Sequence, residues 1–359
     1  MNTRRDLIVF IHGMGVKEPE EYLQKLMTGI RQYCHGKGVP IQTVEDSESE
    51  APGRRRLEVT VDGKPKTMEF QEVYWGDLRP ILSSESVMTK AIRGLSLLGF
   101  WLGSWKTVKQ AFHSKYMMGN MLFTILLLLT WYYGALAMGL TAIGTNPEVF
   151  GTVSLPKSFA EGVKELGASM GSWYVWGMAS VVMGFLPVTN VINISYASKS
   201  YIQNRRDMYH KICGRLGRTL SQLKLAPQPY DTITILAHSF GGVISTEVLS
   251  HYHQGPRVRM ITLGSPLLLM AARSDRIHNA IDQVLANPFV DSWVDFFSEN
   301  DWLCTRSPVA ESHQKFESRQ ITTTVPVDEK ITGASHHLYF EDWEVIETIL
   351  ANSPGHTTV

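Results

Sequence analysis

The stretch from Asp231 to Tyr252 constrains the fold of this chain more than any other. It begins with the short apolar run Thr-Ile-Thr-Ile-Leu-Ala, which is typical of a buried strand. From Val243 onward, apolar residues recur at helical spacing. Between the two lies Ala-His-Ser-Phe-Gly, with small residues two places before and two places after Ser239. Small neighbours permit a tight turn from strand to helix, so the pattern predicts an α/β sheet that displays the Ser239 hydroxyl at its edge.

Two backbone N–H groups are candidates to bind an oxyanion beside Ser239. One belongs to Phe240, because the first N–H groups of a helix point out of its start. The other belongs to Met14, in the loop His-Gly-Met-Gly that follows the apolar run Leu7–Ile11, itself typical of a central parallel strand. An ordinary glycine-rich turn is the alternative. A phosphate-binding loop is disfavoured because the chain lacks Gly-x-x-x-x-Gly-Lys-Ser/Thr.

A second serine fits the same pattern more strictly. Residues 167–171, Gly-Ala-Ser-Met-Gly, match Gly-x-Ser-x-Gly to the letter. They follow a helix-like segment, 159–166, and no predicted strand precedes them. Their two glycines, four positions apart, favour close packing between helices. The context therefore selects Ser239 as the nucleophile and assigns Ser169 to helix packing.

A carboxylate partner for a catalytic histidine is expected where a later strand ends. The segment Trp293–Ser298 predicts such a strand, and Asp301 leaves its carboxyl end in the run Glu-Asn-Asp. Asp301 is therefore the predicted acid. Asp295 lies inside the strand, and Glu299 is the local competitor. An Asn-Asp pair is also a common turn former, which is the structural alternative for Asp301.

The general base is expected in a late loop before the final helix. Residues 333–340, Gly-Ala-Ser-His-His-Leu-Tyr-Phe, precede a predicted helix over 341–350. One of the two adjacent histidines should take the serine proton and later protonate the leaving group. His336 is preferred over His337, and at least one of the two is expected to be an ordinary loop histidine.

The remaining elements follow from hydrophobic patterns and turn residues. A helix is expected over 18–35, a hairpin is expected with its turn at Asp62-Gly63, and two further strands are expected. The predicted strands are 56–61 and 67–75 in the hairpin, then 257–263 and 320–325.

The middle of the chain differs sharply in composition. Residues 121–144 and 166–198 contain no charged side chain, and each run exceeds the about 20 residues that cross a bilayer as a helix. Two membrane spans are predicted, at about 121–144 and 166–190, because Pro187 and two asparagines interrupt the second run. Residues 91–105 are expected to lie in the membrane interface. Lysine and arginine flank the pair, which predicts that both flanks face the cytoplasm. A large apolar lid is the alternative.

Composition excludes several other classes. There are 34 basic and 34 acidic residues, so nothing indicates a nucleic-acid partner. The three cysteines have neither metal-ligand spacing nor the even number of a disulfide framework, and no cofactor or metal is expected. The amino-terminal residues lack the features of a signal peptide, which is consistent with a cytoplasmic catalytic part.

These motifs, in the order serine, acid, histidine, resemble those of the α/β-hydrolase superfamily, in particular the lipase-like serine esterases. The resemblance implies an α/β-hydrolase fold whose core is split into residues 1–80 and 201–359 by a membrane-associated insertion, residues 81–200. It implies a Ser239–His336–Asp301 mechanism on acyl esters, and the membrane location favours lipid or phospholipid substrates. A thioesterase, an acyltransferase and an inactive binding module remain the alternatives, and the oligomeric state is left open.

Overall fold

The computed structural model describes most of the chain in ten stretches. They are residues 3–15, 18–43, 53–61, 63–79, 87–113, 157–170, 188–223, 230–301, 306–321 and 334–351, together with residue 326 and isolated positions between 118 and 140. The chain divides into two compact units. The first contains Met1–Ile81, Ser104–Met117 and Ala197–Val359, and the second contains Leu82–Gly103 and Met118–Tyr196.

The first unit is built on an eight-stranded sheet in the order β2-β3-β4-β1-β5-β6-β7-β8. Strands β2, β3 and β4 pair antiparallel, and every other neighbouring pair is parallel. The predicted α/β class with a mostly parallel sheet is thus confirmed. The strands are β1 (Arg4–Ile11), β2 (Ile41–Thr43), β3 (Arg54–Val61), β4 (Lys64–Glu72), β5 (Thr232–His238), β6 (Val258–Leu263), β7 (Val290–Phe297) and β8 (Phe316–Gln320).

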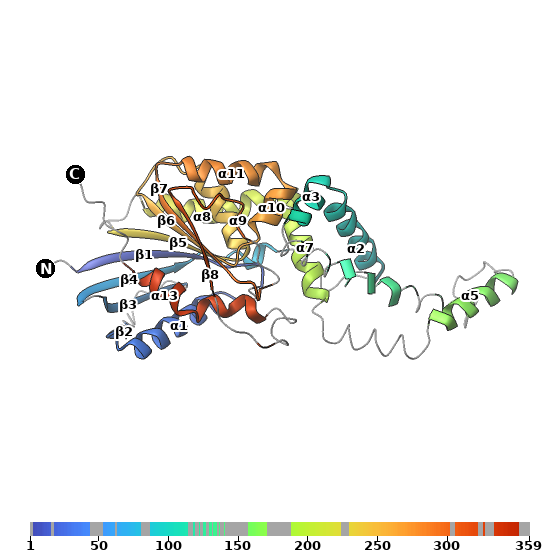
Figure 1. The fold of residues 1–359 in the computed structure, drawn as a ribbon, viewed down its shortest axis with the longest axis horizontal. Coiled ribbons are helices and arrows are strands. Elements are labelled where there is room, and N and C mark those ends of the chain that lie inside the picture. The colour runs from blue at the N-terminus through green and yellow to red at the C-terminus, as the bar shows by residue number, and fades with distance from the viewer. Residues whose placement is uncertain are drawn as a thin grey trace. The chain divides into compact units, whose positions relative to one another are not determined.

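Helices cover both faces of this sheet (Figure 1). On one face lie α1 (Glu21–Lys37) and α13 (Trp343–Leu350), and on the other lie α8 (Met208–Leu223), α9 (Phe240–Leu249) and α11 (Asp275–Ala286). Alternate strand residues such as Ile8 and Phe10 join the apolar faces of α1 and α13 in one core cluster. Because the central strands are buried on both faces of the sheet, their sequences are continuous apolar runs. The first unit also contains η1 (Gly76–Leu78), α3 (Trp105–His113), η3 (Arg205–Asp207), α10 (Leu267–Arg273) and η4 (Ala334–Phe340).

The carboxyl ends of the parallel strands carry most of the segments predicted to form the site. The loop from His12 follows β1, Ser239 follows β5, Gly264 follows β6, and Asp301 lies a few residues beyond β7. His336, in η4, precedes α13. Because the carboxyl ends of parallel strands meet at one edge of the sheet, residues distant in sequence converge there.

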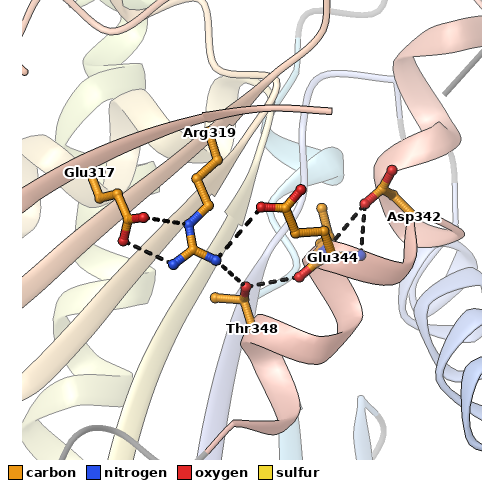
Figure 2. A network of polar contacts seen from close by, with 6 residues as sticks. Glu317, Arg319, Asp342, Glu344 and Thr348 are labelled. Carbon is orange, nitrogen blue, oxygen red and sulfur yellow. Dashed lines mark hydrogen bonds and ion pairs between the residues drawn. The ribbon is translucent and has the colours of Figure 1, made fainter. Parts of the chain in front are cut away.

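The last helix is fastened to the sheet by a polar network centred on Arg319 of β8 (Figure 2). The guanidinium binds both carboxylate oxygens of Glu317, at 2.7 and 2.9 Å, and donates to Thr348 Oγ1 at 3.0 Å. It also lies 3.8 Å from the Glu344 carboxylate. Asp342 caps the helix by accepting from two backbone N–H groups at 3.0 and 3.2 Å. These contacts hold α13, and hence η4 before it, against the sheet.

Strand β8 differs from its prediction. The expected strand was 320–325, whereas β8 is Phe316–Gln320, and residues 322–325 lie outside the described part of the chain. The strand is placed by Phe316, which pairs with Trp293 of β7 and packs edge-on against its ring at 5.2 Å. The other β8 side chains are polar or charged, as is common on an edge strand, so the apolar pattern gives little signal. The other predicted strands, and the predicted helices 18–35 and 341–350, are confirmed to within a few residues.

The second unit contains α2 (Val87–Leu102), α5 (Lys157–Met170) and most of α7 (Val188–Ile202). Among the residues that the structure describes, no helix combines the length and the apolar character that a bilayer span requires. Most of the predicted spans, 121–144 and 166–190, lie outside those residues. Of the described positions in 121–144, five bear exposed large hydrophobic side chains: Leu122, Leu126, Leu129, Tyr133 and Leu136.

Candidate active site

Ser239 occupies a strained turn between β5 and α9. Its backbone angles are φ 56° and ψ −125°, a conformation that residues with a side chain rarely adopt. Its N–H donates to the carbonyl of Leu263 at 2.8 Å, which fastens the turn to the end of β6. Strain of this kind persists only where the surroundings enforce it, and it clusters at functional sites. The predicted strand–turn–helix context of Ser239 is therefore confirmed.

Two glycines allow this turn to form against β1. A Cβ atom at Gly241 would lie 2.3 Å from the carbonyl oxygen of Ile11. A Cβ atom at Gly13 would lie 2.5 Å from Ser239 Cβ and 2.9 Å from its Oγ. Gly241, two places after Ser239, must therefore be small because it contacts the neighbouring strand β1. Gly13, in the loop after β1, lies directly beside the serine hydroxyl.

Asp301 and His336 form a buried pair. Nδ1 of His336 lies 2.6 Å from Oδ2 of Asp301, which also accepts a hydrogen bond from the Tyr339 hydroxyl at 3.1 Å. Both Asp301 and His336 are buried. A Cβ atom at Gly264, the residue after Leu263, would lie 3.1 Å from the same carboxylate oxygen. The acid thus lies beside the end of β6, to which Ser239 is bound.

The two competing acids are placed differently. Asp295 is buried inside β7, where it accepts from Thr262 Oγ1 and from the Ser307 N–H, and burial raises its pKa to about 6. Thr262 in turn accepts from the indole of Trp293 at 2.9 Å, so Asp295 belongs to a structural network within the sheet. Glu299 is exposed. Of the three candidates, Asp301 is the one in contact with His336.

The structure also separates the two adjacent histidines. Nε2 of His337 faces the Tyr22 hydroxyl at 3.5 Å, while the ring packs edge-on against Tyr22 at 5.0 Å. Burial, reinforced by the nearby His336, lowers the pKa of His337 to about 4. Among the described residues, no hydrogen bond joins His337 to a carboxylate, and a histidine held neutral in this way is suited to packing. The geometry therefore favours His336 as the base, as the sequence predicted.

His12 organises the loop that carries Met14. Its Nδ1 donates to the Gly13 carbonyl at 2.7 Å, and its Nε2 accepts from the Trp75 N–H at 3.1 Å. The indole of Trp75 donates back to the His12 carbonyl at 3.0 Å, and the two rings stack. Burial lowers the pKa of His12 to about 4, so this arrangement of one donor and one acceptor persists at neutral pH.

The oxyanion candidates Met14 and Phe240 are both buried; Phe240 directly follows Ser239, and Met14 directly follows Gly13, which lies against the serine. The Arg79 guanidinium donates to the Met14 carbonyl, and the Ser198 hydroxyl lies 3.7 Å from the Met14 sulfur. Phe240 begins α9 and packs edge-on against Tyr201 at 5.0 Å. A peptide bond directs its C=O and N–H to opposite sides, so the hydrogen bond on the Gly13 carbonyl also fixes the direction of the Met14 N–H.

Ser169 has no comparable setting. It lies inside the helix α5, and no strand precedes it there. Gly167 also lies in α5, whereas Gly171 is outside the described residues. The expectation that this serine belongs to a helix is confirmed, and its proposed packing role stays a prediction.

Sequence reasoning missed three contributors to this site: His238, Tyr339 and Tyr22. Tyr339 binds Asp301, Tyr22 packs against His238 and His337, and His238 bonds to the main chain of His336. Each of them lies next to a predicted site residue or faces one across the fold. Aromatic and histidine residues of this kind are indistinguishable from core residues until their partners are known.

Among the described residues, no group of three or more His, Cys, Asp or Glu side chains is arranged to hold a metal ion. Cys34 is buried and Cys213 is partly buried; both are free thiols. No family model, curated protein or solved structure matches the chain. The geometry of the site is therefore the basis for any functional assignment.

Proposed function

We propose that the protein is a serine hydrolase of the α/β-hydrolase type that cleaves acyl esters. One observation carries the proposal: Asp301 contacts His336 at 2.6 Å in a buried setting. The His336 ring lies 4.6 Å, centroid to centroid, from that of His238, the residue immediately before a serine in a strained turn between strand and helix. A nucleophile that follows β5, an orienting carboxylate beyond β7 and a base in η4 are the parts that such a mechanism needs.

Each residue has a distinct role in the proposed reaction. Ser239 Oγ attacks the acyl carbonyl while Nε2 of His336 takes its proton. Asp301 accepts from Nδ1, which holds the ring in the required tautomer and stabilises the imidazolium. The N–H groups of Phe240 and Met14 bind the oxyanion. His336 then protonates the leaving alcohol, and a water molecule, deprotonated by the same ring, releases the acid and restores Ser239.

The surroundings of His336 suit this transfer. His238 and His337 lie with ring centroids 4.6 and 6.0 Å from that of His336. Burial lowers the pKa of His337 to about 4 and that of His238 well below its ordinary value. Both neighbours therefore stay neutral at physiological pH and do not repel the imidazolium that forms in the transition state.

Lipid esters are the proposed substrates, with the second unit as the membrane attachment. Ten of the twelve exposed large hydrophobic side chains in the described part of the chain belong to that unit. On α2 the exposed Ile92, Leu95 and Leu102 recur at helical spacing and form an apolar stripe. Exposed apolar surface on this scale marks an interaction site, and the uncharged runs 121–144 and 166–198 favour a bilayer as its partner. We place the catalytic unit on the cytoplasmic side, following the flanking basic residues.

A carbonate wash tests the attachment. The protein should stay in the membrane fraction at high salt and at alkaline pH, because spans buried in lipid are not held by charge. Release by carbonate would contradict the membrane spans and favour the apolar lid.

Fatty-acid release tests the reaction. The purified protein should hydrolyse short-chain chromogenic esters and phospholipid vesicles, and Ser239→Ala should abolish both activities. Parallel assays with acyl thioesters and with alcohol acceptors identify a thioesterase or an acyltransferase. A folded wild type without activity on any acyl substrate would contradict the proposal and favour a binding module.

A further inference from the structure

We propose that His238 is a positioning residue that holds the main chain of the base, His336, against the strand that carries the nucleophile. The inference rests on the proposed hydrolase function. His238 is the last residue of β5, immediately before Ser239, and it is fully buried. Its Nε2 lies 2.8 Å from the carbonyl oxygen of His336, 98 positions away in the chain.

This bond complements the contact with Asp301. Asp301 binds the His336 ring through Nδ1, which orients the side chain. The bond from His238 fixes the peptide carbonyl of the same residue. The Ser335 hydroxyl binds the Asn300 carbonyl at 2.8 Å, which ties the preceding residue to the acid loop. The base is therefore held at its ring, at its carbonyl and at its neighbour, and only the carbonyl bond leads directly to the nucleophile strand.

Hydrogen-bond chemistry assigns the tautomer of His238. A carbonyl oxygen can only accept, so Nε2 must carry the proton. Among the described residues, Nδ1 has no hydrogen-bond partner although it is buried. The aromatic rings of Tyr22 and Phe340 lie beside the imidazole, with centroids 5.4 and 4.8 Å away. This apolar setting, together with His336 and His337, keeps the ring neutral.

The buried Nδ1 of His238, which has no partner among the described residues, indicates that packing alone does not explain a histidine at this position. A phenylalanine would fill the same aromatic surroundings without leaving a polar atom unsatisfied. The imidazole instead supplies one hydrogen-bond donor to one carbonyl. Losing that donor frees the His336 main chain to shift, and a displacement of about 1 Å at a reacting group can cost roughly 10²-fold in rate.

Two variants separate the donor from the ring. In His238→Gln the amide nitrogen can reach the place of Nε2 and donate to the same carbonyl, whereas His238→Phe keeps the packing without a donor. We expect His238→Phe to lower kcat by about 10- to 100-fold with KM within about twofold of wild type. His238→Gln should recover kcat to within a few-fold. Thermal unfolding of both variants measures any loss of stability separately.

The outcomes distinguish positioning from packing. Full activity of folded His238→Phe, or equal losses in the two variants, would overturn the inference. If His238→Phe does not fold, the kcat of His238→Gln is the test. A loss of more than tenfold in that variant would contradict the donor role of His238.

A readout independent of activity comes from nuclear magnetic resonance of ¹⁵N-histidine in the detergent-solubilised full chain. The His238 signals should show a protonated Nε2 and a bare Nδ1 from pH 8 to pH 5. The opposite tautomer, or a charged ring in that range, would overturn the inference. A wild-type protein that shows the expected tautomer but hydrolyses no substrate would contradict the proposed function, and with it the positioning role of His238. The hydrogen bond between His238 and the His336 carbonyl would still stand.

Discussion

Replacing Asp301 by asparagine removes one negative charge beside the base. Oδ2 of Asp301 accepts both from Nδ1 of His336, at 2.6 Å, and from the Tyr339 hydroxyl, at 3.1 Å. An asparagine whose carbonyl oxygen takes the place of Oδ2 can keep both hydrogen bonds. The variant therefore isolates the contribution of the carboxylate charge to the imidazolium that forms in the transition state.

The magnitude follows from the contact. A 2.6 Å distance between nitrogen and oxygen places the charge centres of ring and carboxylate about 4 Å apart. At an effective dielectric constant of about 20, two unit charges at this separation interact by about 4 kcal/mol. Since each 1.36 kcal/mol is about tenfold in rate, Asp301→Asn should lower kcat by roughly 10³-fold. An amide that instead turns its NH₂ toward Nδ1 imposes the wrong tautomer, which raises the loss to about 10⁴-fold.

Asp295→Asn is the matched control, because it neutralises another buried carboxyl, inside β7, whose hydrogen bonds go to Thr262 and Ser307 and not to His336. Its turnover should stay within a few-fold of wild type. Both variants are assayed on a chromogenic short-chain ester, with circular dichroism as the check on folding. Equal losses in the two variants, or a folded Asp301→Asn enzyme with more than a tenth of wild-type kcat, would refute the assigned role of Asp301.

Three further changes have definite expected results. Gly13→Ala should lower ester hydrolysis by at least about 10²-fold, since the added methyl group enters the space of the Ser239 hydroxyl, and retained activity would contradict the site geometry. Ser169→Ala should leave hydrolysis within a few-fold of wild type, and a large loss in a folded variant would reverse the assignment of the nucleophile. Burial lowers the pKa of His238 below its ordinary 6.5, so the folded state binds fewer protons than the unfolded state as the pH falls below that value. Between pH 6.5 and 5, the free energy of unfolding of wild type should therefore fall relative to that of His238→Gln by up to about 1.4 kcal/mol per pH unit. Urea unfolding measures this difference, and midpoints that change equally with pH in the two proteins would contradict it.

The parts of the site that follow strand ends were predictable from the sequence. Ser239, Asp301 and the His12 loop each follow an apolar run, and the carboxyl ends of parallel strands meet. The strand–turn–helix setting also separated Ser239 from Ser169, although Ser169 fits the motif better. Local pattern was sufficient here because a tight turn needs small residues at fixed positions around the serine.

Features that depend on contacts between distant segments were not predictable. Whether His336 or His337 faces Asp301 is decided by the course of the 3₁₀ helix η4, which adjacent histidines do not reveal. The bond from His238 to His336 joins residues 98 positions apart, and no periodicity marks it. Strand β8 was not predicted over 316–319, because Phe316 is its one buried apolar side chain on an otherwise polar edge.

Covalent labelling of the nucleophile tests the central claim most directly. A fluorophosphonate reacts with an activated serine, so the full-length protein in its membranes should carry the label on the peptide that contains Ser239. Mass spectrometry should find that label in wild type and in Ser169→Ala, at a much reduced rate in Asp301→Asn, and not at all in Ser239→Ala or His336→Ala. A folded wild-type protein that stays unlabelled, or one whose label lies on Ser169, would contradict the proposed hydrolase mechanism.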